Sequence, residues 1–386
     1  MDVNGVSRRR ALCLLGTGLS LVAGCSSADE TDGNGTGDET ETPDSSDSDD
    51  ADSSTGTIET GELPAFAPAL ADSPAERYFF GVVDLETMWT AFDGDGESEF
   101  SSGGDSAEGE DGGDGDQTPT DPLVVNPLFV ALIGYVVLLG LGFSAAGSVY
   151  ERNDRVDGEG YVVFANDTNI VVSDYDFDGI VRDMGELDYE EILREDDRAV
   201  YYDDTAGQAV GATASLFVYA YESEEDGDGD GFDPIEAVER HVDAAVGERS
   251  LKHETDDDFE WLLRAGDTTG LVCGLFSDDD ELAADETALE GDDLEPAEGS
   301  DSVDSLTFDG RPYNGAKGGL QHLDIVTDET RPFASAVFTY ADEDRIDEAV
   351  LEDSVGTQAE TGSTTVVRDG ATVRVEATYA AETLEE

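Results

Sequence analysis

The stretch that decides the fold is Leu128-Phe129-Val130-Ala131-Leu132-Ile133-Gly134-Tyr135-Val136-Val137-Leu138-Leu139-Gly140-Leu141-Gly142-Phe143. It lies inside a longer segment, residues 122–150, that holds no charged residue in a chain that is 29% charged. An apolar helix of about 20 residues is long enough to span a bilayer. A helix that is apolar on all sides can equally be buried in the core of a domain. The first interpretation divides the chain between two sides of a membrane, and the second keeps it on one side.

The flanks of this segment favour different answers. No Lys or Arg lies between Arg77 and Arg152, so the positive-inside rule would place the region after Arg152 in the cytoplasm. However, the strand-and-helix pattern of residues 78–89, before the segment, resembles that of residues 168–184, after it. If those two pieces share a sheet, they must lie on the same side of the membrane. The sequence leaves both topologies open.

The N-terminus reads as an export signal. Arg8 and Arg9 precede an apolar run of 13 residues, 11–23, which is too short for a membrane-spanning helix. Paired arginines before such a run are typical of twin-arginine export. Residues 21–25 resemble a lipobox, which predicts that Cys25 is lipidated, becomes the mature N-terminus and anchors the chain in the membrane. The alternative is an uncleaved signal anchor that ends in an incidental cysteine.

The charge balance indicates a saline environment. Ninety-four acidic and 19 basic residues give a net charge of -75. Self-repulsion of this size strains a domain in dilute buffer, but in molar salt the Debye length falls to about 3 Å. With its signal and acidic linker, the chain resembles an uncharacterised haloarchaeal lipoprotein exported by the twin-arginine route. That resemblance implies a lipid-anchored protein on the extracellular face, and the charge argues against nucleic acid as a partner.

Composition and periodicity divide the chain into segments. The predicted fold class is α+β, with a disordered acidic linker, one long apolar helix and tandem ferredoxin-like modules of strand, helix and hairpin. The modules rest on a strand–helix–hairpin order that begins with an apolar run at 214–221, predicted to be a central strand, and that recurs after Ala334. The predicted segments are an export signal at 1–25, the linker at 26–62, a strand–helix piece at 63–92, an acidic loop at 93–121, the apolar helix at 122–150, a module at 160–277, an acidic connector at 278–300 and a module at 301–386.

Three local patterns define the expected elements of the modules. Asp233 and Pro234 are typical of the start of a helix. Residues 259–263 and 270–276 are predicted to pair as a hairpin around Gly266. Residues 364–368 and 372–379 are predicted to form a second hairpin that turns at Asp369-Gly370, a favoured type I′ pair.

The best candidate for a metal site is an acidic loop. Asp residues at alternating positions followed by Gly resemble the start of a calcium-binding loop, and the possible ligands are Asp226, Asp228, Asp230 and Asp233. The twelfth position of that loop is Ala237, so the bidentate Glu of an EF-hand is missing. A flexible acidic loop without calcium is the alternative. Asn34 and Asn166 each begin a three-residue glycosylation sequon.

The sequence shows no catalytic constellation. Its three histidines, His241, His253 and His322, are scattered, and neither a nucleophile elbow nor a phosphate-binding loop is present. Cys273 is expected to be a core residue. The sequence therefore predicts a non-enzymatic, membrane-anchored surface protein with an envelope structural or binding role. The alternatives are a transmembrane protein with a cytoplasmic sensory domain, and an extracellular hydrolase that would show a clustered His/Asp/Ser pocket.

Overall fold

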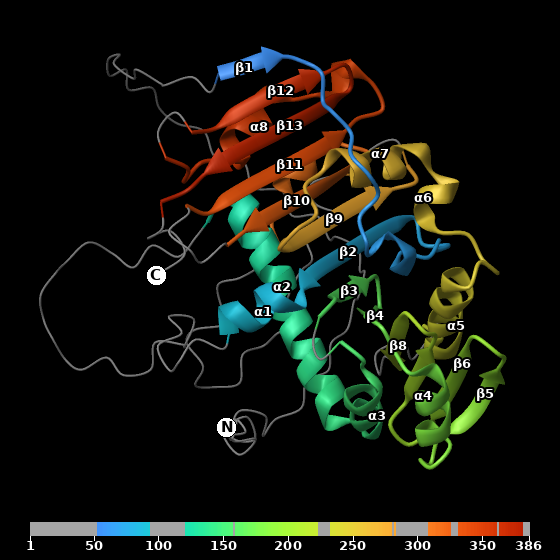
Figure 1. Cartoon of the computed structure of the whole chain (residues 1–386). Coiled ribbons are helices and arrows are strands. Elements are labelled where there is room, and N and C mark those ends of the chain that lie inside the picture. Colours follow the sequence, from blue (N-terminus) through green and yellow to red (C-terminus); the bar gives the residue numbers. More distant parts are fainter. Residues whose placement is uncertain are drawn as a thin grey trace, which may run out of the picture.

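A computed structural model describes residues 52–92, 120–156, 159–222, 232–279, 282, 308–325, 331–360 and 363–380. All named strands of these residues join one 13-stranded sheet (Figure 1). Only the first pair in the sheet is parallel, and all other neighbours are antiparallel. The spatial order is β1 (Asp52–Thr55), β12 (Thr365–Asp369), β13 (Thr372–Thr378), β11 (Phe333–Thr339), β10 (Gly318–Asp324), β9 (Leu271–Ser277), β2 (Arg77–Asp84), β3 (Tyr161–Ala165), β4 (Thr168–Val172), β8 (Leu216–Tyr221), β7 (Gln208–Ala212), β6 (Ala199–Asp203) and β5 (Glu190–Arg194).

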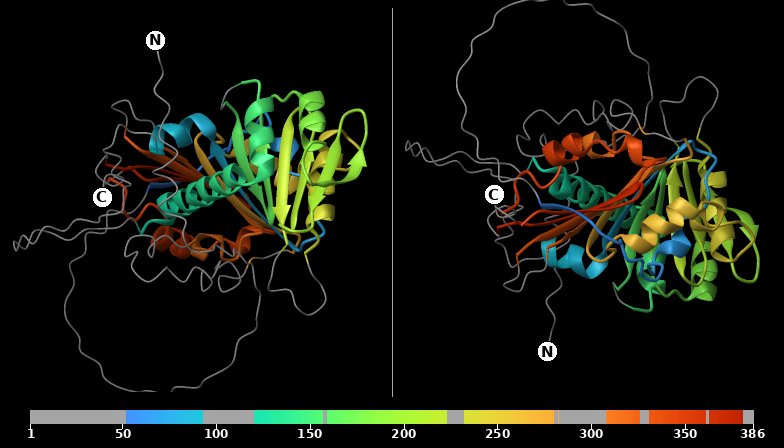
Figure 2. Two further views of the ribbon diagram at one scale, coloured as in Figure 1. Left: turned by 90° about the horizontal axis from the view of Figure 1, so that it is seen from below. Right: turned by 90° about the horizontal axis from the view of Figure 1, so that it is seen from above.

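Helices cover both faces of the twisted sheet (Figure 2). The core of the first face includes side chains of α1 (Leu85–Phe92), α2 (Pro122–Phe143), α3 (Ala145–Asn153), α4 (Phe177–Met184) and α8 (Glu348–Ser354). The core of the second face includes side chains of η2 (Ala67–Ala69), α5 (Pro234–Ala245) and α7 (Asp257–Ala265), and α6 (Lys252–Thr255) packs on α7. Because both faces of the sheet are covered, a central strand buries the side chains that point to either face. The strand β8 shows this pattern, since its first five residues are all buried.

The apolar helix α2 forms a layer of this domain. It packs across β2, β9 and β10. The strand β2 precedes α2 in the sequence, and β3 follows it. These two strands pair with each other in the sheet, with Val82 of β2 opposite Val163 of β3. Length and composition alone would allow α2 to cross a membrane, although 61% of its most apolar window is buried in the domain.

Buried polar groups hold the first half of α2 in place. Asp121, the N-cap residue, has no exposed surface and accepts a hydrogen bond from Leu123 N at 3.1 Å. Asn126, also fully buried, donates from Nδ2 to Gln321 Oε1 of β10 at 2.9 Å and to the carbonyl oxygen of Asp309 at 2.9 Å. Buried polar groups need such partners. These bonds fix the position of α2 along the sheet and hold the helix close against the sheet.

Gly81 of β2 permits the close approach of α2. A Cβ atom at this position would overlap the two methyl groups of Val130 in α2. Gly81→Ala is therefore expected to lower the free energy of unfolding by about 1–3 kcal/mol through overpacking. Urea unfolding at constant molar KCl will measure the loss. The double variant Gly81→Ala/Val130→Ala should recover part of it, because the two changes share one contact. Strictly additive losses would contradict the contact.

The structure corrects two parts of the predicted organisation. Residues 259–263, predicted to be a strand, belong to α7, because Asp256 caps its N-terminus and Phe259, Leu262 and Leu263 recur at helical spacing on its buried side. The strand 270–276 is confirmed as β9, but it pairs with β2 and β10 rather than with 259–263. The described C-terminal hairpin β12–β13 is confirmed, and Gly370 has the expected positive φ of 59°.

The predicted boundaries also change. Residues 52–62, assigned to the disordered linker, include the edge strand β1, which is parallel to β12, and the buried Ile58. A further strand, β10, lies between β9 and β11 and was not predicted. The described strands on either side of the acidic connector join one continuous sheet, so the predicted modules do not have separate sheets.

Candidate functional site

A cluster of His, Ser, Asp and Arg lies on the second face of the sheet. His322 of β10 and Ser335 of β11 are directly paired neighbours, and Arg374 of β13 is paired with Val337, two residues beyond Ser335. Asp267 comes from the loop between α7 and β9. This clustering has the residue types expected of a hydrolase, so its geometry decides what chemistry it can support.

Asp267 is the centre of the cluster. Ser335 Oγ donates a hydrogen bond to Asp267 Oδ2 at 2.7 Å, and Arg374 Nη2 donates to the same oxygen at 2.8 Å. Arg374 Nη1 also donates to the carbonyl oxygen of Ala265 at 2.9 Å, at the end of α7. These bonds join the C-terminal end of α7 to two strands of the sheet.

His322 lies beside this network without activating it. Its Nε2 is 3.4 Å from Thr269 Oγ1, and its Nδ1 has no hydrogen-bond partner among the described residues. Burial lowers the pKa of His322, and the nearby Asp267 and Asp324 carboxylates oppose that shift. A serine nucleophile needs a base that accepts its proton and a path for substrate. Here the Ser335 hydroxyl is bound to Asp267, and His322 and Ser335 are each only 2% exposed.

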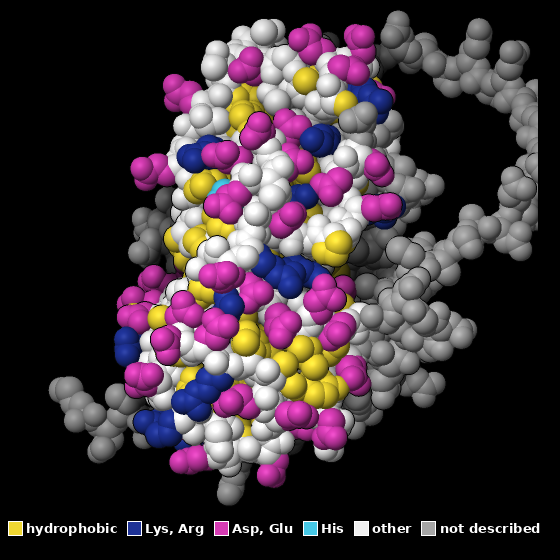
Figure 3. Space-filling model, turned by 90° about the vertical axis from the view of Figure 1, so that its right-hand side faces the viewer, with side chains coloured by type: hydrophobic (Ala, Val, Ile, Leu, Met, Phe, Trp, Pro, Cys, Tyr) yellow, Lys and Arg dark blue, Asp and Glu magenta, His cyan; other side chains and the backbone are white. Residues whose placement is uncertain are grey.

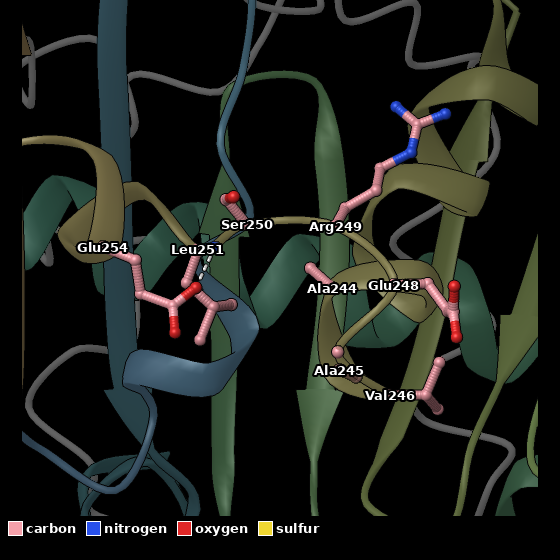
Figure 4. A pocket seen from close by; sticks show the side chains of 9 residues that line it. Ala244, Ala245, Val246, Glu248, Arg249, Ser250, Leu251 and Glu254 are labelled. Atoms are coloured by element: carbon pink, nitrogen blue, oxygen red, sulfur yellow. Dashed lines mark hydrogen bonds between the residues drawn. The ribbon is translucent and has the colours of Figure 1, made fainter.

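Two surface hollows lie elsewhere. The larger, about 570 Å³, is lined by residues 244–251 and Glu254 at the C-terminal end of α5 (Figure 4). In it, Leu251 N donates to Glu254 Oε2 at 2.9 Å, and the side chains of Glu248 and Arg249 point in different directions. The smaller, about 450 Å³, is lined by residues 195–197. Neither hollow includes a residue of the His322 cluster, so the cluster and the hollows do not form one site.

The predicted calcium ligands lie mostly outside the described residues. Asp226, Asp228 and Asp230 fall there, and so do Arg8, Arg9, Cys25 and Asn34. Asp233 is described and caps α5, because its Oδ1 accepts hydrogen bonds from Ile235 N at 2.9 Å and Glu236 N at 3.2 Å. Within the described part of the chain, no group of three His, Cys, Asp or Glu residues is placed to hold a metal ion.

Asn166, the second predicted glycosylation site, has a structural role in the turn between β3 and β4. It has a φ of 48°, a conformation that Asn tolerates better than most residues. Its Oδ1 accepts a hydrogen bond from Phe79 N at 2.9 Å, and its Nδ2 is 3.4 Å from Ser73 Oγ. The sequon residue Thr168 is buried. A glycan on Nδ2 would have to displace the contact with Ser73.

Cys273 is confirmed as a core residue. It is a free, fully buried thiol in β9, and burial raises its pKa to about 12. A thiol held protonated in this way is a poor nucleophile. Its nearest polar neighbour is Gln321 Oε1, at 3.6 Å from Sγ.

His241 gives a prediction of pH dependence. It is buried in α5, and Nδ1–H donates to the carbonyl oxygen of Ala69 at 2.8 Å. Burial lowers its pKa to about 4, although the bond to Ala69 opposes the shift. Because the unfolded chain binds this proton below about pH 6.5, stability falls as the pH drops from 6.5 toward 4. The full loss from this residue is about 3 kcal/mol.

The test compares the wild-type chain with His241→Gln, whose side-chain amide can still donate to Ala69. Unfolding is measured between pH 7 and pH 5 at constant KCl. The difference in unfolding free energy between the two chains should shrink by up to about 1.4 kcal/mol per pH unit below pH 6.5. A difference that does not change with pH would show that His241 is not the buried, neutral group described.

Comparison with known proteins assigns no family. No family model and no curated protein matches the chain. Among solved structures, crystal forms III and I of TP0453 are 10% and 8% identical, with TM-scores of 0.35 and 0.34. These matches cover 84% and 85% of this chain and 97% of TP0453. Similarity at this level carries neither a fold assignment nor a function.

Proposed function

We propose that this protein is a non-enzymatic, membrane-anchored domain on the surface of a halophilic archaeon, with a structural or binding role in the envelope. The proposal begins with the N-terminal signal: Arg8 and Arg9 would direct twin-arginine export, and Cys25 would carry the lipid. Twin-arginine export moves a folded cargo, which suits a chain whose sheet must be assembled from distant segments.

The observation that carries this proposal is the pairing of β2 with β3 on either side of α2 in the sequence. If α2 crossed a bilayer, these two strands would lie on opposite sides of it. Their pairing supports a topology with the whole sheet outside, together with the Asp121 and Asn126 bonds that hold α2 on the sheet. The same pairing argues against the alternative of a cytoplasmic sensory domain.

Two further observations support a surface role without catalysis. Acidic side chains are spread over the face seen in Figure 3, with basic ones scattered among them, as suits a protein that keeps its hydration in molar salt. The serine of the His322 cluster is bound by Asp267 and not by the histidine.

In the C-terminal part, β11, α8, β12 and β13 follow the predicted strand–helix–hairpin order. We retain ferredoxin-like modules, fused edge to edge, as a proposal for the origin of the sheet.

The anchor is tested in a halophilic host. Cys25→Ser should release most of the protein from the membrane fraction to the medium, whereas Cys13→Ser, in the same signal, should leave it at the membrane. Arg8→Lys/Arg9→Lys should retain the precursor inside the cell. Protease treatment of intact cells should cleave beyond residue 152. If that region stays protected while the linker is cut, the cytoplasmic alternative is correct.

A further inference from the structure

The second half of α2 carries an apolar stripe on its outer side. We call Leu132, Val136, Leu139 and Phe143 the outer stripe, and their helical spacing places them on one side of the helix. The first three are partly exposed, and Phe143 is 54% exposed, the highest value among the exposed large hydrophobic residues of the described chain. The opposite side of the helix, including Val137 and Leu141, is buried in the domain.

Charge separates this stripe from the rest of the surface. Residues 122–150 hold no charged side chain, although the whole chain has a net charge of -75. Charged residues return at Glu151. Arg152 and Arg155 follow, with side chains that are 56% and 55% exposed, and both are paired with aspartates. The apolar side of a helix that lies in a membrane surface enters the boundary between headgroups and acyl chains, and an uncharged stripe is suited to that position.

The tether brings a membrane within reach. In the proposed function the lipid is on Cys25, and only 26 residues, 26–51, separate it from β1. A second copy of this chain is the competing occupant of the stripe, and its self-association is one outcome of the test.

We propose that the outer stripe of α2 lies in the surface of the lipid bilayer to which Cys25 tethers the chain. This inference rests on the proposed function and adds its membrane partner. The buried side of α2 remains part of the domain core, while Phe143 and Leu139 enter the boundary between headgroups and acyl chains. The helix therefore lies along the membrane and does not cross it.

The test uses the mature chain, residues 25–386, with Cys25→Ser, so that no lipid and no signal peptide contribute to binding. Flotation in molar KCl with vesicles of phosphatidylcholine, alone or mixed with phosphatidylglycerol, measures the affinity. The added change Leu139→Asp/Phe143→Asp should weaken binding by at least about tenfold. The matched control is Ile192→Asp/Tyr221→Asp, which places the same charges at two positions that are each 38% exposed outside α2 and should leave binding unchanged.

A second measurement does not depend on the charged variants. The tryptophan of Phe143→Trp should shift its fluorescence emission to the blue when vesicles are added, and that of Tyr221→Trp should not.

Equal binding of the stripe variant and its control would overturn the proposal. So would self-association of the chain that the stripe variant abolishes, because a second copy would then cover the stripe. Since these vesicles test a chain without lipid, failure here is distinct from failure of the Cys25 anchor, which the localisation of Cys25→Ser in cells tests separately.

Discussion

Asp121→Ala is expected to lower the free energy of unfolding by about 3–5 kcal/mol. Its carboxylate is fully buried and accepts four hydrogen bonds. Oδ1 accepts from Leu123 N and Gly356 N, both at 3.1 Å. Oδ2 accepts from Gln358 N at 3.2 Å and from the hydroxyl of Tyr379 at 2.9 Å.

The physical reason is that the variant leaves four donors without a partner, and two of them, Leu123 N and the Tyr379 hydroxyl, are buried. Each buried, unsatisfied donor costs about 1–3 kcal/mol. The N-terminus of α2 also loses the negative charge that its helix dipole favours. One residue thus joins α2, the segment after α8 and the end of β13, and all three contacts are lost together.

Asp233→Ala is the matched control. Asp233 caps α5 in the same way, with its side chain bonded to two backbone N–H groups, but it is exposed to solvent. Its loss should cost about 1 kcal/mol, the usual value of an N-cap. Urea unfolding of both variants at constant molar KCl gives the comparison. If the two losses are equal, Asp121 acts only as a helix cap. The interpretation that it also holds α2 to the segment after α8 and to the end of β13 would then be wrong.

Removing salt is the second change with a large expected effect. The chain should be folded in molar KCl and should unfold cooperatively on dialysis to about 0.1 M salt, where the Debye length grows from about 3 Å to about 10 Å. The net charge of -75 is then less screened, and repulsion between carboxylates opposes the compact state. Far-UV circular dichroism during the dialysis measures the transition.

Sucrose provides the control for this experiment. It strengthens burial because it is excluded from the protein surface, but it does not screen charge. Sucrose at the osmolarity of the KCl should therefore fail to keep the chain folded at low ionic strength. A chain that stays folded in dilute buffer, with an unchanged urea midpoint, would contradict the electrostatic argument.

Local signals in the sequence predicted several elements correctly. Asp233 and Pro234 mark the start of α5, Asp369-Gly370 marks the turn between β12 and β13, and the apolar run at 214–221 predicted the central strand β8. In each case a few neighbouring residues carry the physical cause. A cap, a positive φ or an unbroken apolar run needs no distant partner.

One element was predicted wrongly although its signals are local, and other elements depend on distant partners. Residues 259–263 form a short apolar run, which suits a strand or a helix equally until the cap at Asp256 is taken into account. The strand β10 begins with Gly318 and Gly319 and has a mixed pattern that does not predict a strand by itself. The His322 cluster joins residues from positions 267, 322, 335 and 374, and no short motif connects them.

The segment 122–150 shows the same division most clearly. The sequence by itself determined that this stretch is free of charge, mostly apolar and long enough to span a membrane as a helix, because those properties are local. Only the tertiary structure decided which side of the helix is packed: Asp121 bonds to residues 356, 358 and 379, and Asn126 bonds to residues 309 and 321. The physical reason is that apolar side chains leave water for lipid or for a protein core with similar gain, whereas buried polar groups need specific partners. In this chain those partners lie almost 200 residues or more further along the sequence.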